Sequence, residues 1–147
     1  MDRQAAIEIL LEHYQSPHHR GPIADADVMM PGGNPGCGDV VTIFLKVDRS
    51  VDKVEKITFV GEGCTISQAA ASILTDMVQD TPLVEIEDMD YHVMMDTLGQ
   101  EVAQSRPRCS TLALGTLKAA IKKYRTDRMR EEAGLPPTDD SVEPFLV

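Results

Sequence analysis

The sequence predicts an α+β fold with a small antiparallel sheet of three strands and about five helices. Two observations lead to this prediction. Two neighbouring segments alternate β-branched and polar residues, and the segments before and after them repeat their apolar residues with the period of a helix. The length of 147 residues, with 42% hydrophobic side chains, suits one compact domain with its own buried core.

The N-terminal half is expected to hold one helix and all three strands. Residues 3–15 place apolar side chains three and four positions apart, which is typical of a surface helix, and Pro17 ends it. A loop rich in Pro and Gly follows, with a short strand around Val28–Met30. The segments 39–48 and 54–63 are separated by a short polar turn, so we expect them to pair as an antiparallel hairpin.

After the hairpin, the spacing of apolar residues changes to that of helices. The predicted helices cover residues 66–78, 83–88, 90–98 and 109–130. The residues after the last helix are acidic and include Pro, which favours a loose segment. We therefore expect one domain at 1–130, followed by an acidic and flexible C-terminal tail at 131–147.

The charge and the distribution of apolar residues limit the partners and the location. The formal net charge of −10 repels phosphate backbones and anionic lipid headgroups, so neither a nucleic acid nor a membrane is expected as a partner. The sequence contains no run of about 18 apolar residues and no signal-peptide pattern at its start. These features predict a cytoplasmic protein.

The three cysteines lie where loops meet the predicted strands and helices. Cys37 precedes the first hairpin strand, Cys64 lies between the second strand and a helix, and Cys109 opens the last helix. An odd number of cysteines in a cytoplasmic chain indicates metal binding, catalysis or simple burial rather than disulfides. At a helix N-terminus a thiolate is favoured by the helix dipole, and Arg106 and Arg108 should favour that of Cys109 further.

A metal centre forms if the hairpin returns Cys64 alongside Cys37 and the last helix begins at the same end of the sheet. Cys37, Asp39, Cys64 and Cys109 would then converge as three thiolates and one carboxylate. Such a set suits Zn²⁺ or an iron-sulfur cluster with one labile ligand. The alternative is that the three cysteines are unrelated buried side chains, because the sequence has no CxxC pair.

Three cysteine motifs resemble those of the iron-sulfur cluster scaffold family, which includes IscU, SufU and the N-terminal domain of NifU. The motifs are Asn34-Pro35-Gly36-Cys37-Gly38-Asp39, Gly61-Glu62-Gly63-Cys64-Thr65-Ile66-Ser67 and Arg108-Cys109-Ser110-Thr111-Leu112-Ala113. The segment Leu11-Glu12-His13-Tyr14-Gln15-Ser16-Pro17 also looks like the N-terminal segment of that family. The resemblance implies a small antiparallel sheet covered on one side by helices.

The resemblance also implies a function. Cys37, Cys64 and Cys109 would be the thiols that hold the cluster or accept sulfur, and Asp39 would be a labile oxygen ligand. The protein would take sulfur from a cysteine desulfurase, build a labile [2Fe-2S] cluster and pass it to apo iron-sulfur proteins or carrier proteins. The carboxylate is a hard ligand for a cluster that prefers thiolates, which would keep the cluster transferable.

Departures from the family motifs leave a second function open. Arg108 stands where IscU proteins have a histidine, and residues 104–107 replace the motif that a dedicated chaperone reads. Arg108 and Cys64-Thr65-Ile66-Ser67 look more like SufU, but the chain is too short between Cys64 and Cys109 for the full SufU insertion. The alternative is therefore a zinc-dependent sulfurtransferase in which Cys109 accepts the persulfide sulfur. A zinc-stabilised adaptor without sulfur chemistry is a third possibility.

Three histidines form a weaker candidate site. His13, His18 and His19 could make a metal patch, but histidines at a helix end and in a proline-containing loop are more often solvated. Asp76 and Asp80, four residues apart on a predicted helix, give no case for acid-base catalysis. We therefore expect the three histidines to be solvated.

Overall fold

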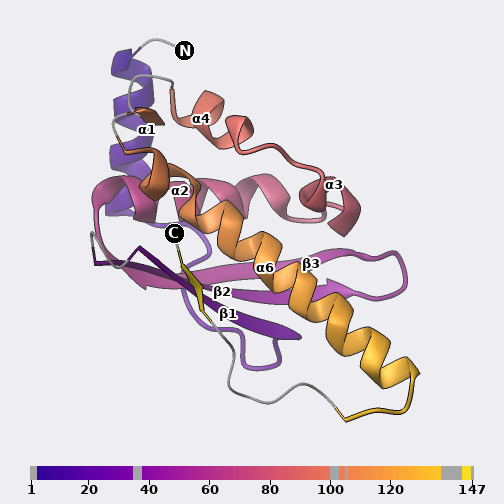
Figure 1. Ribbon diagram of the computed structural model, residues 1–147. Helices are drawn as coiled ribbons and strands as arrows, with labels where there is room; N and C mark the ends of the chain where they lie inside the picture. Colours follow the sequence, from indigo (N-terminus) through magenta and orange to yellow (C-terminus); the bar gives the residue numbers. More distant parts are fainter. Residues whose placement is uncertain (1–2, 35–37, 100–102, 105, 137–143, 147) are drawn as a thin grey trace.

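The computed structural model describes residues 3–34, 38–99, 103–104, 106–136 and 144–146. These residues have the predicted α+β fold, with a four-stranded sheet in the order β3-β2-β1-β4 (Figure 1). The elements are α1 (Arg3–Gln15), β1 (Val28–Asn34), β2 (Asp39–Asp48), β3 (Lys53–Glu62), α2 (Thr65–Val78), α3 (Leu83–Glu87), α4 (His92–Leu98), α6 (Pro107–Glu132) and β4 (Phe145–Leu146).

Strands β1, β2 and β3 form the predicted antiparallel sheet. In the β2–β3 hairpin Ile43 lies opposite Phe59, and both side chains are completely buried. Alternate residues of β2 are buried, as expected for a strand with one face on a core. Strand β1 pairs with β2 and extends to Asn34, which is further than the short strand predicted at Val28–Met30.

Strand β1 continues through Pro31-Gly32-Gly33 because α6 crosses it closely. A Cβ atom at Gly32 would lie only 1.9 Å from Oγ1 of Thr116, a buried residue of α6. Glycine weakens an isolated strand but allows this approach of helix and sheet. The Pro and Gly residues by themselves predict a loop, because a sequence pattern carries no information on the packing of the distant helix α6.

Helices α2 and α6 lie together across one face of the sheet (Figure 1). Helix α2 is rich in small residues, and Ala69, Ala70 and Leu74 are completely buried in the core. Helix α1 packs on α2, and α3 and α4 contact α6. The predicted helices are all present, although α6 begins at Pro107 and ends at Glu132.

Strand β4 was not predicted. Phe145 and Leu146 pair in parallel with Gly32 and Gly33 of β1, so the end of the chain adds a strand to the sheet. Phe145 lies against α6, where a Cβ at Gly115 would meet its ring at 2.5 Å. The flexible tail at 131–147 remains a prediction, because residues 137–143 lie outside the described part of the chain.

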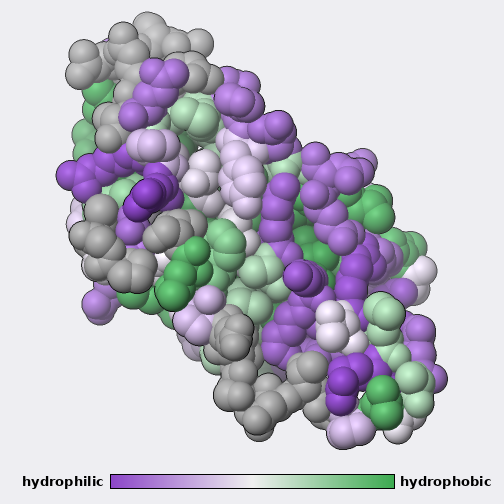
Figure 2. Space-filling model, in the orientation of Figure 1, coloured by the Kyte–Doolittle hydropathy of each residue, from purple (hydrophilic) through white to green (hydrophobic). Residues whose placement is uncertain are grey.

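The face of the domain in Figure 2 carries both hydrophilic and hydrophobic side chains. Hydrophilic side chains gather over the C-terminal half of α6 (Figure 2). There Arg125 forms ion pairs with Glu87 at 2.5 Å and with Asp52 at 3.1 Å, which tie α6 to α3 and to the β2–β3 turn. None of the helices formed by the described residues is long and apolar enough to cross a membrane.

Candidate metal centre

One end of the sheet brings together three of the four residues singled out in the sequence. Asp39 is the first residue of β2, Cys64 follows β3, and Cys109 lies in the first turn of α6. The antiparallel hairpin places the start of β2 beside the end of β3, since Val40 pairs with Glu62. Cys37, the fourth predicted ligand, lies outside the described residues.

Asp39 connects the two described thiols. Its Oδ1 accepts a hydrogen bond from the backbone N–H of Cys64 at 2.7 Å. Its Oδ2 accepts a hydrogen bond from the thiol of Cys109 at 2.9 Å and lies 3.8 Å from Sγ of Cys64. One ligand atom of each residue lies within 4.8 Å of the other two, so the three side chains face a common point.

Local backbone structure fixes Cys64. It is the N-cap of α2, and its sulfur accepts a hydrogen bond from the backbone N–H of Ser67 at 3.5 Å. Gly63, with φ +141°, lets the chain pass so close to Asp39 that a Cβ would lie 2.2 Å from Oδ1. Gly63 belongs to the second cysteine motif, but its role follows only from this close approach to Asp39.

The centre is buried on one side and accessible on the other. Asp39 and Cys109 are only 1% and 2% exposed, whereas Cys64 is half-buried. A substrate or partner would therefore reach the centre from the side of Cys64 and Gly63, since Gly63 is exposed.

The carboxylate of Asp39 is stabilised in its charged form. Burial by itself raises the pKa of Asp39. The hydrogen bonds from Cys109 and from the backbone and thiol of Cys64 lower the pKa by more than burial raises it, so the net pKa lies below the ordinary value. Asp39 is thus an anionic carboxylate in the folded protein at neutral pH.

The expectation of a readily formed Cys109 thiolate is wrong for the metal-free protein. Burial raises the pKa of Cys109 well above its ordinary value, and the hydrogen bond that its thiol donates to Asp39 raises it further. Arg106 and Arg108, which were expected to favour the thiolate, are both exposed. A metal ion would replace the thiol proton and reverse this preference.

The metal-free protein is expected to become less stable as the pH rises above about 9, the ordinary thiol pKa. Because the folded state raises the pKa of Cys109, the unfolded chain loses its proton first, and stability falls by up to about 1.4 kcal/mol per pH unit. Urea unfolding of chelator-treated protein between pH 7 and pH 10 measures this effect. The Cys109→Ser variant is the control, and a stability difference between the two proteins that does not change with pH would contradict the assignment.

The residues present fit a metal ion or a small cluster. Thiolate sulfur together with one carboxylate oxygen matches the ligands of zinc sites and of iron-sulfur clusters. Asp39 and Cys109 are already oriented by mutual hydrogen bonding, so little rearrangement is needed for both to bind one ion.

Of the three histidines that the sequence predicts to be solvated, His13 is shielded by the fold, whereas the side chains of His18 and His19 are each 39% exposed. His13 is buried, and its ring packs against that of His18 at a centroid distance of 4.4 Å. His18 and His19 both contact Asp76, which the sequence gave no partner. These residues belong to α1, the following loop and α2, and they lie apart from the cysteines in the fold.

Comparisons with known proteins identify relatives over most of the chain. Residues 6–131 match the family described as "NifU-like N terminal domain". The iron-sulfur cluster assembly scaffold protein IscU of Aquifex aeolicus is 33% identical, over 88% of this chain and 83% of that protein. The zinc-dependent sulfurtransferase SufU of Bacillus subtilis is 28% identical, over 76% of this chain and 70% of that protein.

A solved structure confirms the fold. The N-terminal part of a nitrogen-fixing NifU-like protein from Brucella abortus superposes with a TM-score of 0.70 and covers 81% of this chain and 93% of its own. Its sequence is only 18% identical, so this likeness concerns the arrangement of helices and strands.

Proposed function

This chain belongs to the NifU-like N-terminal domain family, and on that premise we propose that it is a scaffold for iron-sulfur cluster assembly. The observation that carries the proposal is the contact of one carboxylate oxygen of Asp39 with the thiols of both Cys64 and Cys109. The cargo is a labile [2Fe-2S] cluster, and its ligands are Cys37, Asp39, Cys64 and Cys109. A scaffold of this kind binds and releases its cargo and need not be an enzyme.

The sulfur comes from the persulfide of a cysteine desulfurase. Fe²⁺, which is a substrate of assembly, would displace the thiol proton of Cys109 to solvent, and the resulting thiolate attacks the outer sulfur of the persulfide. The persulfide S–S bond breaks, the desulfurase keeps its thiolate, and Cys109 carries the new persulfide. Two electrons from a dithiol-class reductant then convert the transferred sulfur to sulfide. Apo iron-sulfur proteins or carrier proteins receive the finished cluster.

Anaerobic assembly with Fe²⁺, cysteine and a cysteine desulfurase tests the scaffold. We expect a sulfide-to-iron charge-transfer band in the visible spectrum, and we expect its loss in Cys37→Ala, Cys64→Ala and Cys109→Ala. Thr111→Ala is the matched control, since Thr111 lies in the same turn of α6 and bonds only to the backbone of Pro107 among the contacts described. Full cluster formation in any of the three cysteine variants would contradict the ligand assignment.

A second candidate function is a zinc-dependent sulfurtransferase. It is favoured by Arg108 in front of Cys109 and by the likeness to SufU. Here the four residues hold Zn²⁺, and Cys109 leaves the metal to take the sulfur. In the assembly assay a sulfurtransferase gives no cluster absorption band. It accelerates sulfur turnover by the desulfurase, and only after Zn²⁺ has been added back. Cys109→Ser should then lose the acceleration.

A further inference from the structure

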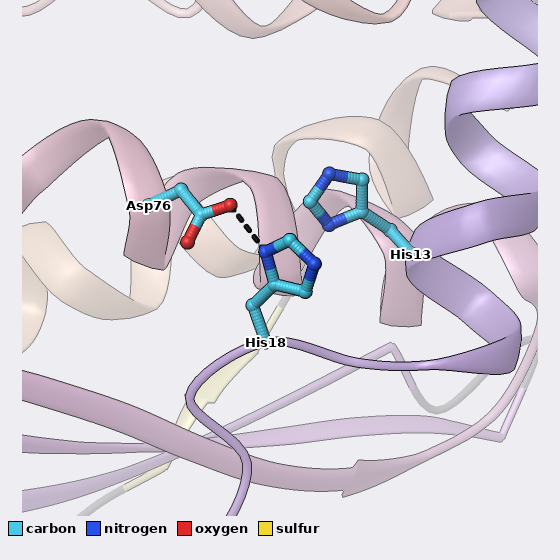
Figure 3. A group of neighbouring side chains, drawn as sticks. All are labelled: His13, His18 and Asp76. Atoms are coloured by element: carbon cyan, nitrogen blue, oxygen red, sulfur yellow. Dashed lines mark hydrogen bonds and ion pairs between the residues drawn. The ribbon is translucent and has the colours of Figure 1, made fainter.

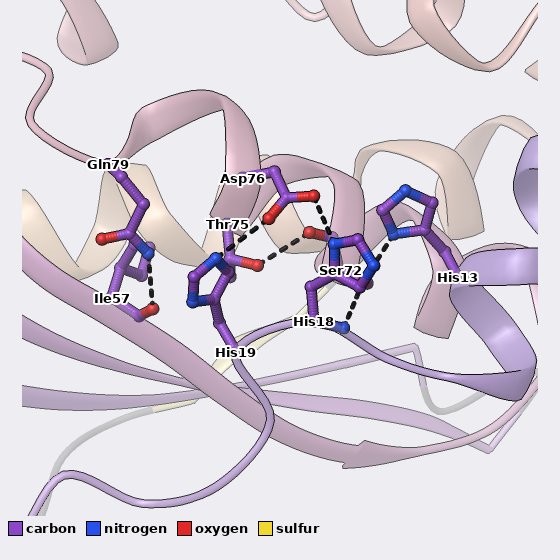
Figure 4. A network of polar contacts seen from close by, with 8 residues as sticks. All are labelled: His13, His18, His19, Ile57, Ser72, Thr75, Asp76 and Gln79. Carbon is purple, nitrogen blue, oxygen red and sulfur yellow. Dashed lines mark hydrogen bonds and ion pairs between the residues drawn. The ribbon is translucent and has the colours of Figure 1, made fainter.

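A second group of side chains of the types that bind metals lies where α1 and the loop after it pack against the C-terminal half of α2. We call His13, His18, His19 and Asp76 the histidine cluster. Oδ2 of Asp76 lies 2.6 Å from Nδ1 of His18, and Oδ1 lies 2.9 Å from Nε2 of His19 (Figure 4). One ligand atom of His13, one of His18 and one of Asp76 all lie within 4.8 Å of one another (Figure 3).

Hydrogen bonds from the surrounding fold hold the cluster in place. Oγ of Ser72, one turn before Asp76 on α2, lies 2.7 Å from Nδ1 of His13 and accepts a bond from the backbone N–H of His18 at 2.8 Å (Figure 4). The backbone carbonyl of His19 accepts a bond from Phe59 in β3 at 3.0 Å. Such supporting contacts orient ligands at many metal sites.

The cluster combines a buried imidazole with accessible ones. His13 is 8% exposed, and burial together with the neighbouring His18 lowers its pKa, so the ring is neutral and keeps a lone pair at pH 7. The side chains of His18 and His19 are each 39% exposed and can move. His13, His18 and Asp76 therefore need only small side-chain shifts to reach the bond lengths of about 2.0–2.1 Å that Zn²⁺ takes.

We propose that the histidine cluster binds a divalent transition-metal ion of the Zn²⁺ type, through His13, His18 and Asp76. Imidazole nitrogen with one carboxylate oxygen is a donor set that such ions favour. The ion takes the place of the hydrogen bond between Asp76 and His18. It joins the end of α1 and the following loop to α2.

This site is separate from the metal centre of the proposed function. Asp76 lies twelve positions after Cys64, which at 1.5 Å per residue is about 18 Å along α2. The histidine cluster contains no sulfur ligand, so the two sites differ in their spectra and in their affinity for soft metals. The proposal therefore holds or fails independently of cluster assembly.

Titration of the intact, reduced chain with Co²⁺ as a probe for Zn²⁺ tests the proposal. Ions bound by thiolates give strong sulfur-to-cobalt charge-transfer absorption, whereas an ion in the histidine cluster gives only weak visible bands. We expect a Co²⁺ ion without the charge-transfer signal to bind wild type. Its affinity should fall at least about tenfold in His18→Gln and Asp76→Asn.

Two control variants match these substitutions. His92→Gln removes an exposed histidine of α4, and Asp80→Asn removes an exposed carboxylate just after α2, so both should bind Co²⁺ like wild type. Equal affinity in Asp76→Asn and wild type would overturn the proposal. Because a variant could misfold, ring-nitrogen NMR of wild type gives an independent test. Signals of His13 and His18 that do not respond to Zn²⁺ would also overturn it.

Discussion

The Gly63→Ala variant is expected to lose metal binding at the centre formed by Asp39, Cys64 and Cys109. Its free energy of unfolding is expected to be about 3 kcal/mol lower than that of wild type. The added Cβ would lie 2.2 Å from Oδ1 and 2.8 Å from Cα of Asp39, so the strand as well as the side chain must move. Backbone strain at φ +141° and overpacking each contribute about 1–3 kcal/mol. Equilibrium denaturation and Co²⁺ binding with its thiolate charge-transfer signal measure the two effects.

Gly21→Ala separates steric displacement from backbone strain. Gly21 has φ +136°, close to that of Gly63, but nothing lies within 4 Å of the Cβ that alanine would add. We expect this control to lose about 1–2 kcal/mol from strain and to keep its affinity at the cysteines. If both variants bind metal equally well, the close approach of Gly63 to Asp39 has no part in shaping the centre.

The Phe59→Ala variant is expected to lower the free energy of unfolding by about 4 kcal/mol, because it leaves a cavity in the core. Phe59 is completely buried opposite Ile43 and is one of the largest side chains in the core. Its backbone also bonds to His19 and Gly21, so loss of packing there should loosen the loop that carries two histidines. Thermal and urea unfolding measure the stability, and hydrogen exchange of residues 16–21 measures the loosening.

Phe44→Ala is the matched control in the neighbouring strand. Phe44 points to the opposite face of the sheet and is only half-buried. Its removal should therefore cost about half as much or less, with little effect on residues 16–21. If Phe44→Ala lowers the free energy of unfolding as much as Phe59→Ala does, the main core does not lie on the face of the sheet that carries Phe59.

Local periodicity was sufficient to predict most helices and the hairpin, because these elements bury one regular face. It failed where distant parts of the chain decide the structure. Strand β1 passes through Pro31-Gly32-Gly33 because α6 approaches it closely, and β4 exists because β1 offers it a free edge. Neither partner can be read from the residues of the strand itself.

The candidate sites also combine features that local sequence predicts with features that depend on distant contacts. The positions of Asp39, Cys64 and Cys109 follow from three element boundaries that the sequence marks with glycine, proline and helix-starting residues. The protonation of Cys109 does not, since it depends on burial and on the hydrogen bond to Asp39. The sequence singled out the three histidines but did not connect them with Asp76, because Asp76 lies far along the chain from the histidines it contacts.

Strand β4 also has a consequence for the order of folding. The β2–β3 hairpin joins residues close in sequence and can form early, whereas Phe145 and Gly32 are separated by about three quarters of the chain. Closing such a long loop costs entropy that only two paired residues offset. We expect β4 to dock last in refolding and to open first in the native state, which would transiently expose the edge of β1 next to Asn34.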